Sequence, residues 1–590
     1  MRSRGRSFLL SDQYKRHLQR IRIHTASFTR KKNFIFNLLG VLFITTAVIL
    51  LLTSSPTQNI NILLDPSTKH PKYNQFHNAN DYPPLQCNTN PFHQPSYNQH
   101  DEMVYWKKIQ PHDASFQSPY INDTTERFLT FEPDDAGWNN VRMGFETILV
   151  LAMITGRTLV LPPNQAYGNI PGVSQTFNFH NIYNLTALMD QYETLKIITM
   201  EDYLTHYGQK GTLKDQSTSQ PLYPPQNKVN WNQSKSISEL YDYLRMVAYN
   251  PLQWKPGQCL AAFPDPINPP RNLETHLQNI LNEVDGRPPP KPHHFYQSPT
   301  PVFAPSMERL REALADRTKL CLYSPEIQTI PNIHFPMDYF QNVRLLSHFY
   351  TFLFHENYHQ DLFTKRFIRD GLRYNNDISC AASKIVQAIR QRAKERNPTS
   401  NPHGDFDSFH IRRNDFQSQF HVTQGDISKI VELSKTQIRP GSTVYIATDE
   451  MDETFFEPMK QIYDLVFSHD FQHLFPPSIT PVQSSDLHHH DGIQDYHWRM
   501  IDQMVAARGR IFHGLFYSTF SGHVMRLRGY YSTKETLDKS GSLKNSFYYM
   551  PRHARNEMQE YRAVRLPSFM REYPVSWRDI DYDVERLKEG

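Results

Sequence analysis

The sequence predicts an α/β protein with parallel sheets, carried on a single membrane-spanning helix. Three observations support this fold class. A nearly unbroken apolar run lies near the N-terminus, at residues 34–52. Residues 128–161 read as strand, turn, helix and strand, which is the pattern of a βαβ unit with parallel strands. A second alternation of strands and helices follows from about residue 366.

The length and charge of the chain limit its possible domain number and partners. A chain of 590 residues is too long for one hydrophobic core, so we expect two or more domains. Residues 1–33 hold ten Lys and Arg against one acid, a charge of +9, so the net +4 leaves −5 for the remainder. A mildly acidic main body argues against nucleic acid as a partner.

The apolar run begins at Phe34 and ends at Leu52. At ~1.5 Å per residue it spans roughly 28 Å, close to the ~30 Å thickness of the hydrocarbon layer. A cleavable signal peptide is the alternative, but its apolar core is usually only about 7–15 residues long. The basic flank precedes the run, which places the tail in the cytosol and the rest in the lumen. We therefore expect a type II protein, anchored in the bilayer of the Golgi or endoplasmic reticulum.

Residues 53–124 are rich in Pro, Asn, Gln, His and Tyr, which is typical of a stem. Asn-x-Ser/Thr triplets at Asn122, Asn184 and Asn232 are usable glycosylation sites in a luminal glycoprotein. Four cysteines allow up to two disulfides, whose pairing the sequence leaves open. They are Cys87, Cys259, Cys321 and Cys380, and their spacing fits no zinc site.

The clearest unit starts at residue 128. The spacing predicts a strand over 128–132, a turn over 133–139, a helix over 140–155 ended by Gly156, and a strand over 158–161. Ligands of parallel sheets bind at the carboxyl ends of strands, which is where the turn falls. Gly137 in that turn would let a ligand approach the backbone.

Residues 164–365 are harder to assign. Two proline-rich stretches, near 214–230 and 286–305, are expected as surface loops. Beyond them, apolar residues at helical spacing predict a helix that ends a first domain near residue 365. They are Val343, Leu346, Phe349 and Leu353.

A buried strand over 408–411 runs directly into Arg412 and Arg413. Guanidinium groups at the mouth of an interior strand need an anion, and their planar forks suit phosphate. Ordinary ion pairs with nearby carboxylates are the alternative. A helix over 425–438 and a strand over 443–448 follow, closed by Asp449, which would accept hydrogen bonds from a base or ribose or else be a solvated turn residue.

A second anion-binding pattern lies further on. A helix over 501–507 and a strand over 510–516 lead into Ser518, Thr519 and Ser521, before a helix over 523–529. Hydroxyls and free N–H groups at such a turn, with the helix dipole behind them, form an anion cradle, although helix capping alone also explains them. The adjacent histidines at 488–490 are expected to be solvent-exposed rather than metal ligands.

Together these stretches resemble the GDP-fucose protein O-fucosyltransferase family. The resemblance rests on Gly137-Trp138-Asn139-Asn140, Gly156-Arg157-Thr158-Leu159-Val160-Leu161-Pro162-Pro163, His410-Ile411-Arg412-Arg413-x-Asp415 and Phe516-Tyr517-Ser518-Thr519-Phe520-Ser521. The Arg-Arg pair is also similar to α1,6-fucosyltransferases. The resemblance covers roughly residues 125–565 and implies a GT-B-like fold, in which two Rossmann-like domains face a cleft.

The domain prediction then runs along the whole chain. We expect a cytoplasmic tail at 1–33, the anchor at 34–52 and the stem at 53–124. An acceptor-side domain follows at 125–365, a GDP-sugar-binding domain at 366–565 and a C-terminal extension at 566–590.

The resemblance also implies roles. Arg412 would contact the diphosphate with Arg413 beside it, and His410 would line the nucleotide pocket. Ser518, Thr519, Phe520 and Ser521 would form the phosphate site, and Asp449 would lie near the nucleoside. Gly137, Asn139 and Asn140 would form the facing wall.

The expected reaction transfers fucose from GDP-fucose to a hydroxyl of a protein or glycan, with inversion. Asp135 is the first candidate for the base, with Asp134 and Glu132 beside it, because Ala136 stands roughly where some relatives carry Glu. We expect no metal, since cationic side chains can replace one at the diphosphate. Two alternatives to this function remain. One is another luminal nucleotide-sugar transferase or a sulfotransferase, and the other is a non-catalytic scaffold of the same fold.

Overall fold

The computed structural model describes Pro83, Leu85 and Cys87 and the ranges 101–165, 178–225, 234–266, 271–284, 300–314, 317–338, 341–475, 492–539, 541–550 and 568–589. All of these residues belong to one compact unit, Tyr73–Gly590. The expected tail, the expected anchor and the histidines at 488–490 lie outside the described residues. Within the described ranges, no helix has the length and apolar character needed to cross a bilayer.

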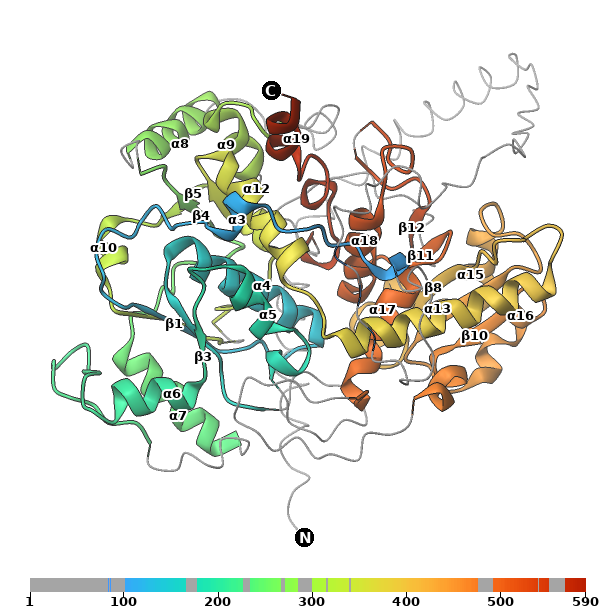
Figure 1. Ribbon diagram of the computed structural model, residues 1–590, viewed down its shortest axis with the longest axis horizontal. Coiled ribbons are helices and arrows are strands. Elements are labelled where there is room, and N and C mark those ends of the chain that lie inside the picture. The colour runs from blue at the N-terminus through green and yellow to red at the C-terminus, as the bar shows by residue number, and fades with distance from the viewer. Residues whose placement is uncertain are drawn as a thin grey trace, which may run out of the picture. The chain divides into compact units, whose positions relative to one another are not determined.

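Three parallel sheets organise the described chain (Figure 1). The first has the order β3-β2-β1-β6, with β1 at Phe128–Phe131, β2 at Thr158–Val160, β3 at Ile197–Ile198 and β6 at Asn332–Phe335. The second has the order β5-β4-β7, with β4 at Cys259–Phe263, β5 at Lys319–Leu322 and β7 at Leu353–His355. The third has the order β10-β9-β8-β11-β12, with β8 at Asp407–Ile411, β9 at Thr443–Thr448, β10 at Asp464–Phe467, β11 at Phe512–Leu515 and β12 at Ser546–Tyr549. The predicted α/β class with parallel sheets is confirmed.

Helices connect and cover these strands. The α-helices are α3 Pro111–Ala114, α4 Trp138–Thr155, α5 Leu185–Gln191, α6 Met200–Tyr203, α7 Ser234–Val247, α8 Arg271–Val284, α9 Ser306–Leu314, α10 Pro325–Thr329, α11 Phe349–Phe352, α12 Tyr358–Arg366, α13 Asn376–Arg396, α14 Asn414–Gln419, α15 Ile427–Ser434, α16 Glu457–Lys460, α17 Trp498–Ala507, α18 Thr519–Tyr531 and α19 Tyr582–Glu589. Short 3₁₀-helices lie at Asp101–Met103, Phe179–Asn181, His421–Thr423, Glu453–Phe456, Ser468–Leu474, Asp495–His497, Ser568–Met570 and Pro574–Ser576. Single π-helical turns lie at Leu204–Gly208 and Phe367–Gly371.

The predicted βαβ unit forms as expected, with small shifts at its ends. β1 pairs in parallel with β2, and α4 between them starts two residues before the predicted helix. Gly156 ends α4 in the left-handed conformation, at φ 65°, and a Cβ there would collide with Ile121. Glycine is required at this stop because a side chain meets both a backbone and a packing penalty.

The helix predicted through Val343, Leu346, Phe349 and Leu353 is wrong. The chain there is extended, makes only the one-turn helix α11 and enters β7 at Leu353. β7 pairs with β4, so hydrogen bonding to a distant strand outweighs the local apolar spacing. The expected domain boundary at 365/366 falls where α12 runs on into the π-helical turn Phe367–Gly371.

The third sheet carries the arginine strand at its centre. β8 lies between β9 and β11, and all five of its residues are buried. α17 packs against β8 and β9. α13 packs against α17 (Figure 1). The predicted strands at 408–411, 443–448 and 510–516 are all present, while the helix predicted over 425–438 is shorter, at Ile427–Ser434.

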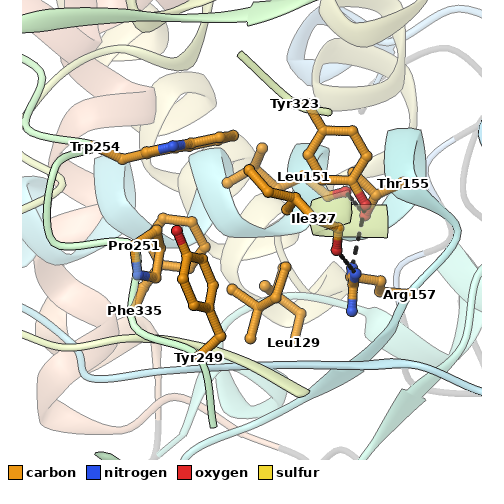
Figure 2. Close-up of a pocket in the computed structure, with 11 residues that line it drawn as sticks. Leu129, Leu151, Thr155, Arg157, Tyr249, Pro251, Trp254, Tyr323, Ile327 and Phe335 are labelled. Carbon is orange, nitrogen blue, oxygen red and sulfur yellow. Dashed lines mark hydrogen bonds between the residues drawn. The ribbon is translucent and has the colours of Figure 1, made fainter. Parts of the chain in front are cut away.

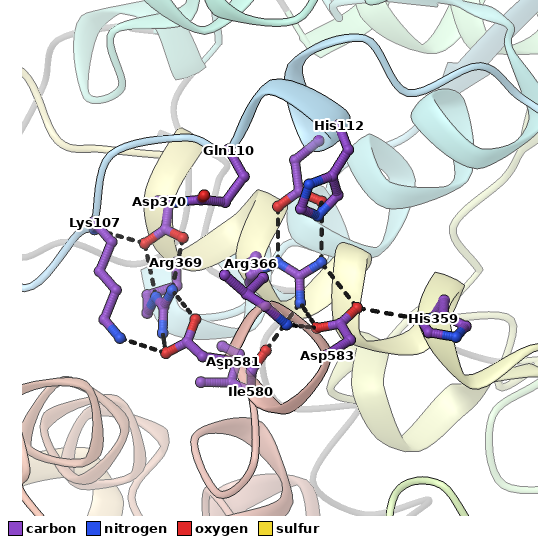
Figure 3. Close-up of polar contacts among 12 residues, drawn as sticks. Lys107, Gln110, His112, His359, Arg366, Arg369, Asp370, Ile580, Asp581 and Asp583 are labelled. Atoms are coloured by element: carbon purple, nitrogen blue, oxygen red, sulfur yellow. Dashed lines mark hydrogen bonds and ion pairs between the residues drawn. The ribbon is translucent and has the colours of Figure 1, made fainter. Parts of the chain in front are cut away.

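Two disulfides and a folded C-terminal segment close the structure. Cys259 and Cys321 join the neighbouring strands β4 and β5, and Cys87 joins Cys380 of α13. Residues 568–589 pack back onto earlier elements, so much of the expected C-terminal extension is part of the folded body. Figure 3 shows Asp581 bonded to Arg369, and Asp583 bonded to Arg366.

Candidate functional site

The predicted donor-binding residues follow three adjacent parallel strands. His410 pairs with Ala447 of β9, and β11 lies on the other side of β8, with Phe512 opposite Ser408. The carboxyl ends of β8, β9 and β11 therefore share one edge of the sheet. Arg412 and Asp449 come directly after β8 and β9, and Ser518 follows β11 after a short turn. Parallel sheets bind ligands at this edge.

Arg412 is held by two carboxylates at this edge. Its Nη1 donates to Asp449 Oδ2 at 2.6 Å, and its Nη2 donates to Asp415 Oδ1 at 2.8 Å. The Arg412 side chain is 22% exposed, and only two of its five N–H donors bond to described residues. Arg412 therefore forms the ion pairs with nearby carboxylates that were the alternative to anion binding. These pairs orient the guanidinium and leave its other N–H donors available to a ligand.

Asp449 organises the turn after β8. Its other oxygen accepts the Arg413 backbone N–H at 2.7 Å, and Asn414 Nδ2 donates to Oδ2 at 3.0 Å. The Arg413 side chain takes a different course, because it lies over the Phe455 ring at 3.5 Å and pairs with Glu450 at 3.2 Å. The two adjacent arginines therefore have separate partners.

His410 connects the arginine strand to the start of α18. Its Nδ1 lies 2.8 Å from Ser521 Oγ, and its ring stacks on Phe520 with centroids 4.2 Å apart. Burial, with the nearby charges of Arg412 and Arg499, holds the pKa of His410 well below its usual range. The imidazole is therefore neutral and serves as a hydrogen-bonding group.

The start of α18 has the features of an anion site. Ser518 is the N-cap residue, and its side chain makes no capping hydrogen bond. Ser518 and Ser521 are buried, while Thr519 is partly exposed. Gly514 makes this position possible, because a Cβ there would lie 2.8 Å from the Ser521 Cβ. The positive end of α18 thus lies directly at the carboxyl end of β11.

The stretch Gly137-Trp138-Asn139-Asn140, at the start of α4, also contacts the start of α18 through one glutamine. Asn139 Oδ1 accepts a hydrogen bond from Gln503 Nε2 of α17 at 2.9 Å. The same Nε2 contacts the Phe520 backbone oxygen at 3.4 Å. Gln503 thereby links Asn139 to the start of α18, and the stretches around 139, 410 and 520 lie together. Gln503 was not among the predicted residues, since a lone glutamine in a helix carries no local signal.

The turn before α4 is open. Gly137 is the N-cap residue of α4, and no atom lies within 4 Å of the place a Cβ would take. Asn140, in the first turn, is partly exposed. Among the described residues, the space beside the Gly137 backbone is therefore open.

The three candidate bases have different surroundings. Glu132 accepts hydrogen bonds from Arg245, His334 and the Met337 backbone. Burial raises the pKa of Glu132, but these donors outweigh it and the net pKa is lowered.

Asp134 is bonded to Arg344 at 2.7 Å through both of its oxygens. Asp135 is exposed and makes no hydrogen bond or ion pair with a described residue. Of the three carboxylates, Asp135 is the one left available to a ligand.

Two pockets in the described part of the chain lie away from the edge of the third sheet. Figure 2 shows an apolar pocket beside β1 and α4, in which Arg157 donates to the Ile327 carbonyl and to Tyr323. The second is lined by Glu132, Asp134 and apolar neighbours. Arg157, part of the resemblance, is thus a buried structural residue, and its pKa is lowered by burial.

In the described ranges, no group of three or more His, Cys, Asp or Glu side chains is arranged so that it could hold a metal ion. The sequence also holds two Asp-x-Asp triplets, Asp405-Phe406-Asp407 and Asp579-Ile580-Asp581, and in each the third residue forms ion pairs. Asp407 pairs with Arg510, and Asp581 pairs with Arg369 and Lys107.

Comparison with known proteins gives one family. The family model described as GDP-fucose protein O-fucosyltransferase matches residues 128–531, more than half of the chain. No curated protein matches the sequence.

Solved structures share a distant likeness. POFUT1 in complex with GDP-fucose is 12% identical, with 72% of this chain and 99% of that chain covered, at a TM-score of 0.30. The fucosyltransferase NodZ from Bradyrhizobium is 12% identical, with 68% and 94% covered, at a TM-score of 0.31. At these scores neither likeness supports a conclusion about this chain.

Proposed function

Because this chain belongs to the GDP-fucose protein O-fucosyltransferase family, and is thus a glycosyltransferase, we propose that it transfers fucose from GDP-fucose to a hydroxyl of a protein or glycan. The observation that carries the proposal is the meeting of the stretches around 139, 410 and 520 at one edge of the third sheet. We further propose the GT-B-like division into domains at 125–365 and 366–565. The body would be luminal, on a type II anchor at 34–52 in the Golgi or endoplasmic reticulum.

The reaction would depend on charge. As the bond between fucose C1 and the diphosphate oxygen breaks, its electron pair stays on GDP, which becomes more negative. Donors already in position bind GDP more tightly as it leaves and so lower the barrier. Arg412, the N–H groups at the start of α18 and the hydroxyls of Ser518 and Thr519 are such donors. They act without a metal in this proposal.

The acceptor would attack from the opposite face. Its hydroxyl oxygen forms the new bond to C1 as the old one breaks, so the anomeric centre inverts through an oxocarbenium-like state. The hydroxyl proton passes to a base, for which Asp135 is the candidate. Asn139 and Asn140 would bind on this side.

The proposal is tested first by ligand selectivity. We expect GDP to raise the unfolding temperature of the purified full-length protein, since a ligand that binds only the folded state stabilises it. Adenosine 3′,5′-bisphosphate should leave it unchanged. Stabilisation by that nucleotide alone would favour a sulfotransferase and contradict the proposal.

Catalysis is tested by release of GDP and free fucose from GDP-fucose, which a non-catalytic scaffold would not produce. We expect Arg412→Ala to lower this turnover by at least ~10²-fold, as loss of one charge-stabilising donor commonly does. The control is Arg311→Ala on α9, which removes a surface pair with Glu283 of α8. A folded Arg412→Ala protein with normal turnover would remove Arg412 from the mechanism.

A further inference from the structure

Arg499 lies close to the predicted donor site, but no sequence motif includes it. It is the second residue of α17, which packs against β8 and β9. Because α17 leads into β11, which is parallel to β8, the helix runs back along the sheet and begins at the carboxyl edge. Asp502, one turn further along, joins the helix to the sheet by accepting a hydrogen bond from Tyr445 of β9 at 2.6 Å.

The charged groups that act on Arg499 come from the same edge of the sheet. They are Arg412 and Asp415, which follow β8, Asp449, which follows β9, and Asp502 on its own helix. Arg499 in turn acts on His410 of β8. Arg499 therefore belongs to the start of α17, at the carboxyl edge where the arginine strand ends.

Arg499 has no anion of its own among the described residues. It makes no hydrogen bond and no ion pair with any of them, although it is partly buried. The carboxylates nearby are already used, because Asp449 and Asp415 bind Arg412 and Asp502 binds Tyr445. Burial and the repulsion from Arg412 lower the pKa of Arg499.

A partly buried cation that faces another cation is unfavourable unless an anion lies near both. Two other arginines nearby each have a carboxylate partner, since Arg413 pairs with Glu450 and Arg510 pairs with Asp407. A ligand with two negative groups, placed between Arg412 and Arg499, would satisfy both guanidinium groups. Planar guanidinium groups bind phosphate oxygens in pairs, which suits a diphosphate.

We propose that Arg499 is a second cationic contact for the diphosphate of the nucleotide sugar, opposite Arg412. The inference rests on the proposed function, since it takes the GDP-sugar site to be at the carboxyl edge of the third sheet. Arg499 then binds the charge that collects on GDP as the fucose–oxygen bond breaks. It makes no contact with the guanosine part.

The test compares GDP with guanosine on the full-length protein by calorimetric titration. We expect Arg499→Gln to weaken GDP binding by about tenfold or more, because a charge-assisted hydrogen bond is lost. Guanosine affinity should not change. Arg499→Lys keeps the charge but not the fork, so its loss should be smaller, and Arg311→Gln is the matched surface control.

The outcomes separate the two proposals. Equal weakening of GDP and guanosine, or no weakening of either, would overturn the role of Arg499. If the unaltered protein binds no GDP, the proposed function fails as well. A measurement without a variant is the modification of arginines by phenylglyoxal, read by mass spectrometry. Arg499 should react in the free protein and be protected by GDP but not by guanosine, and equal reaction with and without GDP would contradict the proposal.

Discussion

At the scale of single residues, the surroundings of Asp135 distinguish it from its neighbours. Glu132 and Asp134 are engaged by Arg245 and Arg344, and so are held as structural partners. Asp135 is exposed, in the turn that leads to Gly137. A carboxylate that is not held by an arginine is the one able to take a proton from an acceptor.

We expect Asp135→Asn to lower kcat for fucose transfer by about 10²–10⁴-fold, the usual contribution of a general base. GDP affinity should stay the same, because the donor-binding groups are on the third sheet. Asp134→Asn is the matched control, and it should lower stability rather than kcat by breaking the pair with Arg344. If both variants keep normal kcat, the base lies outside this turn.

At the scale of elements, one buried charge cluster joins α4, α18 and the C-terminal segment. Arg142 of α4 bonds to Glu146 at 2.6 Å and to Glu572 at 3.1 Å, and Arg526 of α18 also bonds to Glu146. Tyr350 donates to Glu572 as well. The C-terminal segment is thus part of the contact between the two halves of the chain, although the family match ends at residue 531.

We expect Glu572→Gln to lower the free energy of unfolding by about 3–5 kcal/mol, because removing one partner leaves buried charges uncompensated. Burial raises the pKa of Glu572, but the charges of Arg526, His348 and Arg142 outweigh it and lower the pKa to about 2. The carboxylate therefore stabilises the fold above its unfolded pKa, and this is lost as the pH falls toward 2.

Urea unfolding at neutral pH measures this effect, with Glu585→Gln as the control, because Glu585 is exposed on α19. Equal stability of the two variants would show that the cluster does not hold the C-terminal segment.

At the scale of the whole molecule, buried neutral histidines make stability depend on pH. His513 of β11 lies between the rings of Phe409 and Phe547, with centroids 5.0 and 5.1 Å away. Burial, and to a lesser extent Arg528, lowers the pKa of His513 to about 3. In the unfolded chain a histidine has a pKa of about 6.5. The unfolded state therefore binds more protons between these values, and stability falls as the pH drops through this range.

We expect His513→Phe to make stability less sensitive to pH between about 6.5 and 4, by up to about 1.4 kcal/mol per pH unit. The free energy of unfolding in urea, measured at several pH values, checks this. The exposed His403→Phe is the control, and its pH profile should match that of the unaltered protein. A variant at 513 with an unchanged slope would mean that His513 is accessible to protons in the folded state.

Local sequence patterns predicted the structure correctly where the conformation of a segment depends mainly on its own residues. The strand at 408–411, the βαβ unit from 128 to 161 and the glycine stop at 156 were predicted in place, because side-chain alternation and backbone freedom act over a few residues. The helix predicted from the apolar spacing through Leu353 is wrong, because pairing with the distant strand β4 determines the conformation of that segment. Gln503, Arg499 and Glu572 gave no signal, because their roles come from partners far away in the sequence.

By itself the sequence determined the α/β class, the family and the residues that end the central strands, because these follow from short runs read in order. The tertiary structure alone decided which charged groups are already paired and which remain available to a ligand. Arg412 and Arg413 look equivalent in the sequence, yet one faces Asp449 and the other lies on Phe455. The reason is physical: the state of a charge depends on the atoms within a few ångströms of it, and those atoms come from strands and helices far apart in the chain.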